Sequence, residues 1–269
     1  MQSKLFRRQR IAILDPDLRG REHARRVIRA TGHAPYVFAG IEEMQEVDAT
    51  ERPFAMAYLG CASGDEVIEQ TVREVRACLG DTVPLLLAVK PVAVRRVAQA
   101  PTVAADHVMP LQPRFCELYL EISDFMWAHG PHPQHTSLNW GEFRFRPAAR
   151  TVQIGEALPM SLSIFHFELA LELFHNLGRS LSRSWLNTML APPSRAISAS
   201  ALQEGVSRVR HLLALQTPAA WQIQSLEDGA VRLAAVPPEA GRPAPGSAVL
   251  RMASRARVGH GFQSLVTLS

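Results

Sequence analysis

The 269-residue sequence contains little lysine and cysteine, and it has no long apolar run. Lys4 and Lys90 are its only lysines, so arginine supplies nearly all of the positive charge, a pattern that genomic bias also explains. No apolar run reaches the roughly 18 residues that a membrane-spanning helix needs. The apolar stretch after the basic start runs directly into Asp15, so we expect neither a signal peptide nor a membrane partner.

The three cysteines are scattered, without the spacing of metal ligands. Such a sparse and odd count is typical of a reducing cytoplasm, and we expect each thiol to be a small core hydrophobe. A glycine-rich phosphate loop, a serine–histidine–aspartate pattern and paired acids are also missing. These absences argue against an enzyme and give no reason to expect a cofactor.

The charge of the chain is divided unevenly between its halves. Residues 1–137 hold 16 basic and 17 acidic residues, a net of −1, whereas residues 138–269 hold 13 and 8, a net of +5. A basic half joined to a nearly neutral half is the pattern expected when one module binds nucleic acid and the other does not.

Apolar runs and amphipathic runs alternate through the first half. The expected strands are 11–14, 34–38, 54–59 (closed by Gly60), 84–89 and 105–109, and the expected helices are 18–30, 65–79 and 114–127. Continuously apolar strands separated by helices imply a parallel sheet covered on both faces. Residues 1–127 therefore predict an α/β domain of the flavodoxin-like, doubly wound type with five parallel strands.

Residues 128–139 are polar, contain proline and histidine, and lack periodicity, so they predict a linker with few tertiary contacts. His129, His132 and His135 are three apart, but no further ligands lie nearby, and we expect solvated side chains and no metal.

The second half begins with short β-like segments and continues with helices and a hairpin. The segments are 142–146, 151–154, 155–157 and 158–160, the helices are 163–177, 182–190 and 199–215, and two strands flank a turn at 227–229. This order predicts an α+β winged helix-turn-helix over 140–236. Residues 237–269 are rich in Pro, Gly, Ser and Arg, and predict a mostly disordered basic tail.

With these elements in this order, residues 10–235 resemble the OmpR/PhoB-type response regulators. The segment RIAILDPDLR is similar to the family's first strand, which ends in adjacent acids that bind Mg²⁺. Asp15 matches the first acid, Pro16 stands at the second, and Asp17 lies beyond it. The alternative reading of Asp15 and Asp17 is a pair of carboxylates at a helix N-terminus.

The other phosphorylation residues of that family are replaced. In RPFAMAYLGCASGDE, Gly60 falls where the phosphoacceptor aspartate belongs, or Leu59 if the register slips by one. Val89 stands at the hydroxyl position, and Gln112, or Leu111, stands at the lysine position. The resemblance therefore implies a degenerate receiver domain without a phosphoacceptor, of which Asp15 and Asp17 are the acidic remnant.

The segment from Val206 to Leu213 resembles the end of the family's recognition helix. Val206, Val209 and Leu213 are spaced to lie on one inward face, and Gln203, Ser207 and Arg210 on another. The resemblance implies contacts to base edges and phosphates from this helix. The candidate DNA-binding residues are Gln203, Ser207, Arg208, Arg210, His211, Arg183 and Arg232. The alternative is that these side chains are ordinary solvated surface.

The predicted wing has an unfavourable charge for DNA. Glu227 stands at the family's wing arginine and is followed by Asp228. Either the wing stays out of the minor groove, or the basic tail with Arg251, Arg255 and Arg257 replaces it.

The sequence thus predicts a cytoplasmic transcription regulator that binds double-stranded DNA without aspartyl phosphorylation and without catalysis. The resemblance also implies a homodimer on repeated half-sites, with RNA polymerase as a further candidate partner. Two alternatives remain open, namely a protein-interaction module that does not bind DNA and a regulator whose receiver-like domain senses a small ligand.

Overall fold

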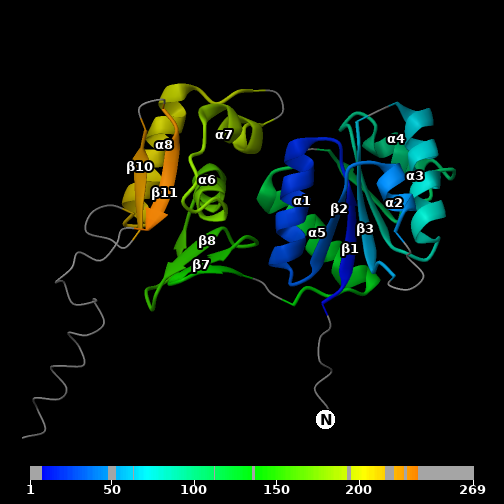
Figure 1. Cartoon of the computed structure of the whole chain (residues 1–269), viewed down its shortest axis with the longest axis horizontal. Helices are drawn as coiled ribbons and strands as arrows, with labels where there is room; N and C mark the ends of the chain where they lie inside the picture. The colour runs from blue at the N-terminus through cyan, green and yellow to red at the C-terminus, as the bar shows by residue number, and fades with distance from the viewer. Residues whose placement is uncertain are drawn as a thin grey trace, which may run out of the picture.

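The computed structural model describes residues 8–47, 53–62, 64–111, 113–134, 137–192, 195–215, 221–226 and 229–235. Two structural units lie side by side, an N-terminal α/β unit and a C-terminal α+β unit (Figure 1). The expected disordered tail, residue Gln112, and the wing acids Glu227 and Asp228 lie outside the described residues.

A parallel sheet with the strand order β2-β1-β3-β4-β5 forms the centre of the N-terminal unit. Its strands are β1 (Arg10–Leu14), β2 (Ala34–Phe38), β3 (Met56–Cys61), β4 (Leu85–Val89) and β5 (His107–Pro110). Strands β3 and β4 are buried along their whole length, which explains why their sequences are continuously apolar. The fold is therefore the expected flavodoxin-like, doubly wound type.

Helices cover both faces of this sheet. They are α1 (Leu18–Ala30), α2 (Ile41–Gln45), α3 (Asp65–Leu79), α4 (Val94–Gln99) and α5 (Phe115–His129). One core cluster joins α1 and α5 to one face of the sheet, and a second joins α3 to the opposite face. Alternate residues of a strand feed the two cores, as Ile13 and Leu14 of β1 do.

The helices predicted at 18–30 and 65–79 have the predicted bounds, whereas α2 and α4 were missed. Helices of five and six residues are too short to show a helical period. The third strand was predicted to be closed by Gly60, which is wrong, because β3 continues through Gly60 to Cys61.

The C-terminal unit consists of a small antiparallel sheet, three helices and a hairpin. The sheet has the order β6 (Leu138–Trp140), β7 (Phe143–Arg146), β8 (Thr151–Ile154) and β9 (Met160–Ser161). Helices α6 (Ile164–His175), α7 (Arg183–Leu190) and α8 (Ala199–Leu212) follow, and then β10 (Trp221–Ser225) and β11 (Val231–Ala235). Phe145, Phe167 and Phe174 form the aromatic centre of its core. This is the winged helix-turn-helix predicted from the order of elements, except that residues 155–157 form a turn and not a strand.

The expectation of a contact-poor linker at 128–139 is wrong. Helix α5 continues to His129 and β6 begins at Leu138, so both ends of the predicted linker belong to regular elements. Between them, the Gln134 amide donates to the Thr31 carbonyl at 2.7 Å, and the His132 carbonyl lies 3.1 Å from Nε2 of His33. Indole and imidazole rings of Trp127 and His132 also stack with centroids 4.6 Å apart. These residues pack on the N-terminal unit.

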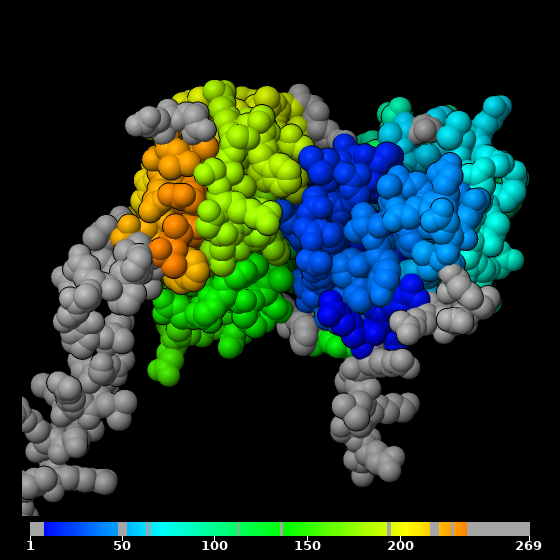
Figure 2. Space-filling view, in the orientation of Figure 1, coloured from blue at the N-terminus to red at the C-terminus, as the bar shows by residue number. Residues whose placement is uncertain are grey.

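The two units share a packed interface. One continuous apolar cluster runs from the α1 and α5 side of the parallel sheet into the core of the C-terminal unit. Figure 2 shows the surface of α1 in direct contact with the neighbouring surface of the C-terminal unit. A shared apolar core of this kind favours one docked arrangement of the two units.

Candidate nucleic-acid interface

Helices α7 and α8 form a helix-turn-helix, and serine side chains define where each begins. The Ser182 hydroxyl accepts from the Trp185 amide at 3.1 Å, and the Ser198 hydroxyl accepts from the Ala201 amide at 3.2 Å. These contacts satisfy amides that the first turn of a helix leaves without a partner. Ser163 caps the start of α6 in the same way, because its hydroxyl accepts from the His166 amide at 3.4 Å.

The inward face of α8 matches its predicted pattern. Val206, Val209 and Leu213 are all buried. Gly205 lets α8 approach α6 closely, because a Cβ at this position would come within 3.0 Å of the Phe165 ring. The apolar period and this glycine fix the rotation of α8, and therefore decide which side chains point outward.

The outward face of α8 presents four of the predicted DNA-binding side chains to solvent. Gln203, Ser207, Arg208 and His211 are exposed. The face divides in two around Ser207. Gln203 and Ser207 border a groove of about 370 Å³ toward the hairpin, whereas Arg208 and His211 border a hollow of about 420 Å³ beside His166 and Glu204.

Arg210 takes a different position from the free outward one that its spacing predicted. It is half-buried, with Nε donating to the Ile223 carbonyl at 3.3 Å and a terminal nitrogen donating to the Ser225 hydroxyl at 3.2 Å. Its guanidinium therefore joins α8 to β10 and holds the hairpin against α8.

The other two predicted DNA-binding residues, Arg183 and Arg232, differ in how exposed their side chains are. Arg183, at the start of α7, is exposed and lines the same groove as Gln203, Ser207 and Arg210. Arg232 is half-buried, and its guanidinium is bonded across the hairpin to the Gln224 side chain at 2.7 and 3.0 Å. The structure thus brings Arg183 and the hairpin-facing side of α8 together, and places Arg232 in a structural contact.

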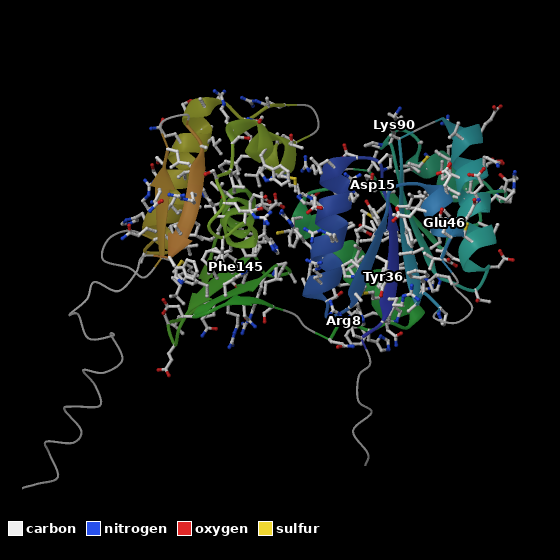
Figure 3. The ribbon with its side chains drawn as sticks, in the orientation of Figure 1. Arg8, Asp15, Tyr36, Glu46, Lys90 and Phe145 are labelled. Atoms are coloured by element: carbon white, nitrogen blue, oxygen red, sulfur yellow. The ribbon has the colours of Figure 1, made fainter. Side chains whose placement is uncertain are left out.

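The two acids that the sequence resemblance assigned to a degenerate phosphorylation site follow β1, at the end of the parallel sheet. Figure 3 places Asp15 and Lys90 at the same end of the N-terminal unit. The Asp17 side chain caps α1 by accepting from the Gly20 amide at 3.0 Å, and the Asp15 carboxylate accepts from the Asp17 amide at 2.9 Å. Both contacts are of the kind expected for carboxylates at a helix N-terminus, which was the alternative interpretation of these two acids.

Asp15 also fills the space in which a side chain at position 60 would begin. A Cβ built on Gly60 would lie closer than 3.0 Å to Cγ and both oxygens of Asp15, and a Cβ on Gly20 would meet the same carboxylate. Val89, which the resemblance places at the hydroxyl position, is buried and apolar, and so is Leu111, the alternative to Gln112 at the lysine position. The site has no acceptor at Gly60 and no room for one while Asp15 keeps this position.

Burial raises the pKa of the Asp15 carboxyl from 3.8 to about 6, against the lowering effect of its hydrogen bond from the Asp17 amide. Its side chain is only 1% exposed and also lies 3.4 Å from the Tyr58 hydroxyl. The folded protein therefore binds this proton more tightly than the unfolded chain does.

Asp15→Asn is expected to stabilise the protein at pH 8, because it removes a buried charge while the amide keeps a hydrogen-bond acceptor for Asp17. The shift of about 2 pKa units corresponds to roughly 2–3 kcal/mol, present above pH 6 and vanishing as the pH falls to about 4. Denaturant unfolding of both proteins across this pH range measures the difference. A variant that is less stable at pH 8, or equally more stable at pH 4, would contradict the expectation.

Structural comparison finds response regulators among the solved structures similar to this chain. The response regulator DrrB of Thermotoga maritima, described as an OmpR/PhoB homolog, is 15% identical, with 85% of this chain and 100% of that chain covered and a TM-score of 0.33.

A structure titled as a novel family of streptococcal redox sensors evolved from two-component response regulators is 14% identical, with 84% and 98% covered and a TM-score of 0.35. The RstA DNA-binding domain of Klebsiella pneumoniae in complex with the RstA box is 21% identical, with 37% and 98% covered and a TM-score of 0.31. No protein-family model matches the sequence, and the search of curated proteins gives no match.

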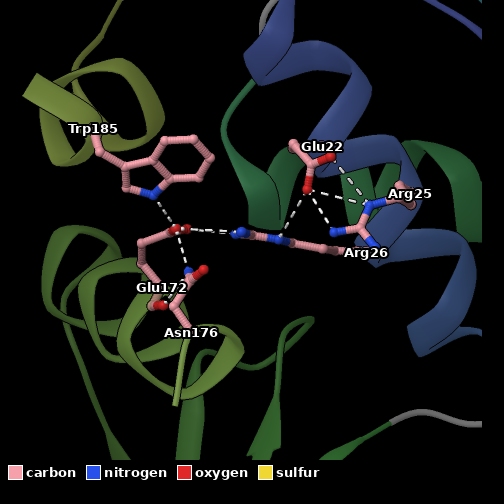
Figure 4. Close-up of polar contacts among 6 residues, drawn as sticks. All are labelled: Glu22, Arg25, Arg26, Glu172, Asn176 and Trp185. Carbon is pink, nitrogen blue, oxygen red and sulfur yellow. Dashed lines mark hydrogen bonds and ion pairs between the residues drawn. The ribbon is translucent and has the colours of Figure 1, made fainter. Parts of the chain in front are cut away.

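The contact between the two units contains a buried ion pair that the sequence did not predict. Arg26 of α1 donates to both oxygens of Glu172 of α6, at 2.5 and 3.3 Å, and both side chains are almost fully buried (Figure 4). Trp185 Nε1 and the Asn176 amide donate to the same carboxylate at 2.7 and 2.8 Å. The sequence did contain a hint of this polar contact. Glu168 and Glu172 lie four residues apart within a mainly apolar helix, where a buried carboxylate needs a partner.

Glu168 forms a second polar contact across the interface. Its carboxylate accepts from the Cys116 amide at 3.2 Å and lies 3.5 Å from the Arg114 guanidinium. Burial raises the pKa of Glu168 to about 7. The Arg19 guanidinium donates to the Ala191 carbonyl, at the end of α7. Polar groups of α1 and of the start of α5 thus contact Glu168, Glu172 and Ala191 of the C-terminal unit.

The cysteines and histidines give no sign of redox or metal chemistry within the residues that the structure covers. Burial raises the pKa of the Cys116 and Cys78 thiols, which disfavours the reactive thiolate. No group of three or more potential metal ligands occurs there. The same residues include no helix long and apolar enough to cross a membrane.

Proposed function

We propose that this protein is a transcription regulator that binds duplex DNA in a sequence-specific way through α8. The observation that carries the proposal is the exposed polar and basic face of α8, which adjoins Arg183 in a helix-turn-helix. Figure 1 shows α6 and α7 between α8 and the N-terminal unit, so the docked partner unit leaves this face accessible. A helix of 14 residues is long enough to lie in the major groove.

The charge distribution supports a polyanionic partner for this half of the chain. Arg183 and Arg208 are exposed on the helix-turn-helix, and the net charge of residues 138–269 is +5. Gln203 has the geometry to pair with an adenine edge, and Ser207 to hold a phosphate. Arg210 acts indirectly in this proposal, because it holds the hairpin beside the groove.

Regulation without aspartyl phosphorylation is the second part of the proposal. It is supported by Gly60 at the acceptor position and by Asp15 in the space beside it. A homodimer on repeated half-sites, RNA polymerase as a partner, and the absence of catalysis complete the proposal, on the strength of the sequence resemblance.

Arg183→Ala and Gln203→Ala are each expected to weaken binding to the selected site by roughly 1–3 kcal/mol if they read a base, with relaxed preference at one position. The site is first obtained by selection from random duplexes, and binding is then measured by fluorescence anisotropy across a salt series. Arg208→Ala is expected to lower affinity for all sequences and to reduce the salt slope by about one.

The matched control is Arg144→Ala, an exposed arginine on β7 away from α8, which should leave affinity unchanged. If the Arg183→Ala, Gln203→Ala and Arg208→Ala triple variant stays folded by circular dichroism and binds as tightly as the wild type, α8 is not the recognition helix. If no duplex is enriched by the wild type, the protein-interaction alternative replaces the proposal.

Beryllofluoride or acetyl phosphate with Mg²⁺ is expected to leave DNA affinity and oligomeric state unchanged, because the N-terminal unit has no acceptor at Gly60. Anisotropy and sedimentation with and without the phosphoryl donor measure this. An acyl-phosphate found by mass spectrometry on any aspartate of residues 1–127 would overturn phosphorylation independence.

A further inference from the structure

A cleft of about 670 Å³ lies where α1 meets the end of α6 and the start of α7. Its lining comes from both units and includes Arg25, Arg26, Arg29, Arg179, Trp140 and Trp185. The volume falls within the range of small-molecule sites in proteins. We call this space the interdomain cleft. It is separate from α8 and from the surroundings of Asp15.

The interdomain cleft has an excess of positive charge. Glu22 is its only acidic lining residue, and it is already paired with Arg25 at 2.6 Å and lies 3.8 Å from Arg26. Arg26 in turn is held by Glu172, as Figure 4 shows. Four arginines thus face two carboxylates, which leaves a local excess of two positive charges.

The excess is located on Arg29 and Arg179. Neither guanidinium forms an ion pair or side-chain hydrogen bond with another residue that the structure describes. Partial burial and then the charges of Arg25 and Arg8 lower the pKa of Arg29. The two arginines come from different units, α1 and the loop after α6, and each offers the planar fork that binds phosphate oxygens.

Aromatic rings form the wall beside these arginines. Trp140 and Trp185 are partly exposed at the cleft, and the ring of His175 packs edge-on against Trp140 with centroids 5.0 Å apart. Burial lowers the pKa of His175 well below its usual value, so this ring is neutral and adds an uncharged surface. A planar ring system fits such a wall better than a fully hydrated ion does.

We propose that the interdomain cleft binds a small organic phosphate monoester with a planar ring, its dianionic phosphate held between Arg29 and Arg179. Two negative charges match the excess of two positive charges, and the ring lies on the Trp140 and Trp185 side. Since the site needs residues from both units, its occupant stabilises the docked arrangement by mass action. DNA is a poorer occupant, because Figure 1 places α6 and α7 between α8 and this side of the molecule.

Isothermal titration of the full chain with adenosine 5′-monophosphate tests this inference, with adenosine and inorganic phosphate as partial probes. The wild type is expected to bind the nucleotide more tightly than either partial probe. Arg29→Glu combined with Arg179→Glu is expected to weaken binding about tenfold or more, because each arginine supplies charge-assisted hydrogen bonds. Arg144→Glu makes the same type of charge change at an exposed residue outside the lining of the cleft, and should leave nucleotide affinity unchanged.

Three results would overturn the inference. The first is that the wild type does not bind the nucleotide, or that the Arg29→Glu and Arg179→Glu double variant binds it as tightly as the wild type does. Another is inorganic phosphate binding as tightly as the nucleotide, which would show a plain anion site without a ring contact. The third is loss of DNA affinity in this variant without nucleotide present, which would make the cleft a DNA-backbone contact. The titration contains no DNA, so it succeeds or fails independently of the function proposed for α8.

Discussion

Arg26→Ala is expected to separate the two units of the protein. The substitution removes the guanidinium that pairs with the buried Glu172 carboxylate at the interface, while Trp185 and Asn176 still donate to it. Removing one member of a buried ion pair typically costs about 3–5 kcal/mol. Undocking of α1 from α6 relieves this cost, because water then reaches the carboxylate.

Small-angle scattering and limited proteolysis measure the separation. We expect a larger radius of gyration and new cleavage beside His132 and Gln134, which contact His33 and Thr31 in the docked protein. The control is Arg25→Ala one position earlier, since Arg25 pairs with Glu22 at a partly exposed position where such a pair contributes roughly 0–1 kcal/mol. If Arg26→Ala matches the wild type in both measurements, the ion pair does not hold the units together.

Gly60→Asp is expected to destabilise the N-terminal unit and not to restore phosphorylation. The new Cβ would overlap the Asp15 carboxyl, and a second carboxylate would enter a buried site. Overpacking alone costs about 1–3 kcal/mol, so Gly60→Ala sets the lower limit of the effect and Gly60→Asp should exceed it. Denaturant unfolding gives the free-energy differences, and mass spectrometry after acetyl phosphate treatment detects any phosphoryl group.

Gly64→Ala provides the matched control, because a Cβ at Gly64 meets nothing within 4 Å. Because Gly64 is the N-cap of α3, where alanine is less favourable than glycine, we expect a loss of no more than about 1 kcal/mol. A Gly60→Asp protein that is as stable as the wild type and accepts a phosphoryl group would show that Asp15 moves aside easily, and would contradict this expectation.

The periodic pattern of the sequence was sufficient for most of the fold. The predicted bounds of α1 and α3 agree with the structure, and so do the buried face of α8 and the strands of the hairpin. These features depend on which side of a local segment is apolar, and the segment itself contains that information. Short elements such as α2 and the three-residue strand β6 contain too few residues to show a period.

The candidate DNA-binding site could be predicted only in part from the sequence. Helical spacing correctly grouped Gln203 with Ser207, but it assigned Arg210 to the same free face. In the structure the Arg210 guanidinium bonds to β10, more than ten residues later in the chain. Spacing gives the direction in which a side chain leaves the helix, and it contains nothing about which distant strand will lie there.

The sequence by itself determined the two folds, their order, the basic character of the second half and the glycine at position 60. Only the tertiary structure decided that Asp15 fills the space beside Gly60 and that Arg26 meets Glu172. It also decided that arginines of both units line one cleft. The physical reason is the range of the interactions. Periodicity records local burial, whereas Arg26 and Glu172 are 146 residues apart and become partners only when the α1 and α6 surfaces pack together.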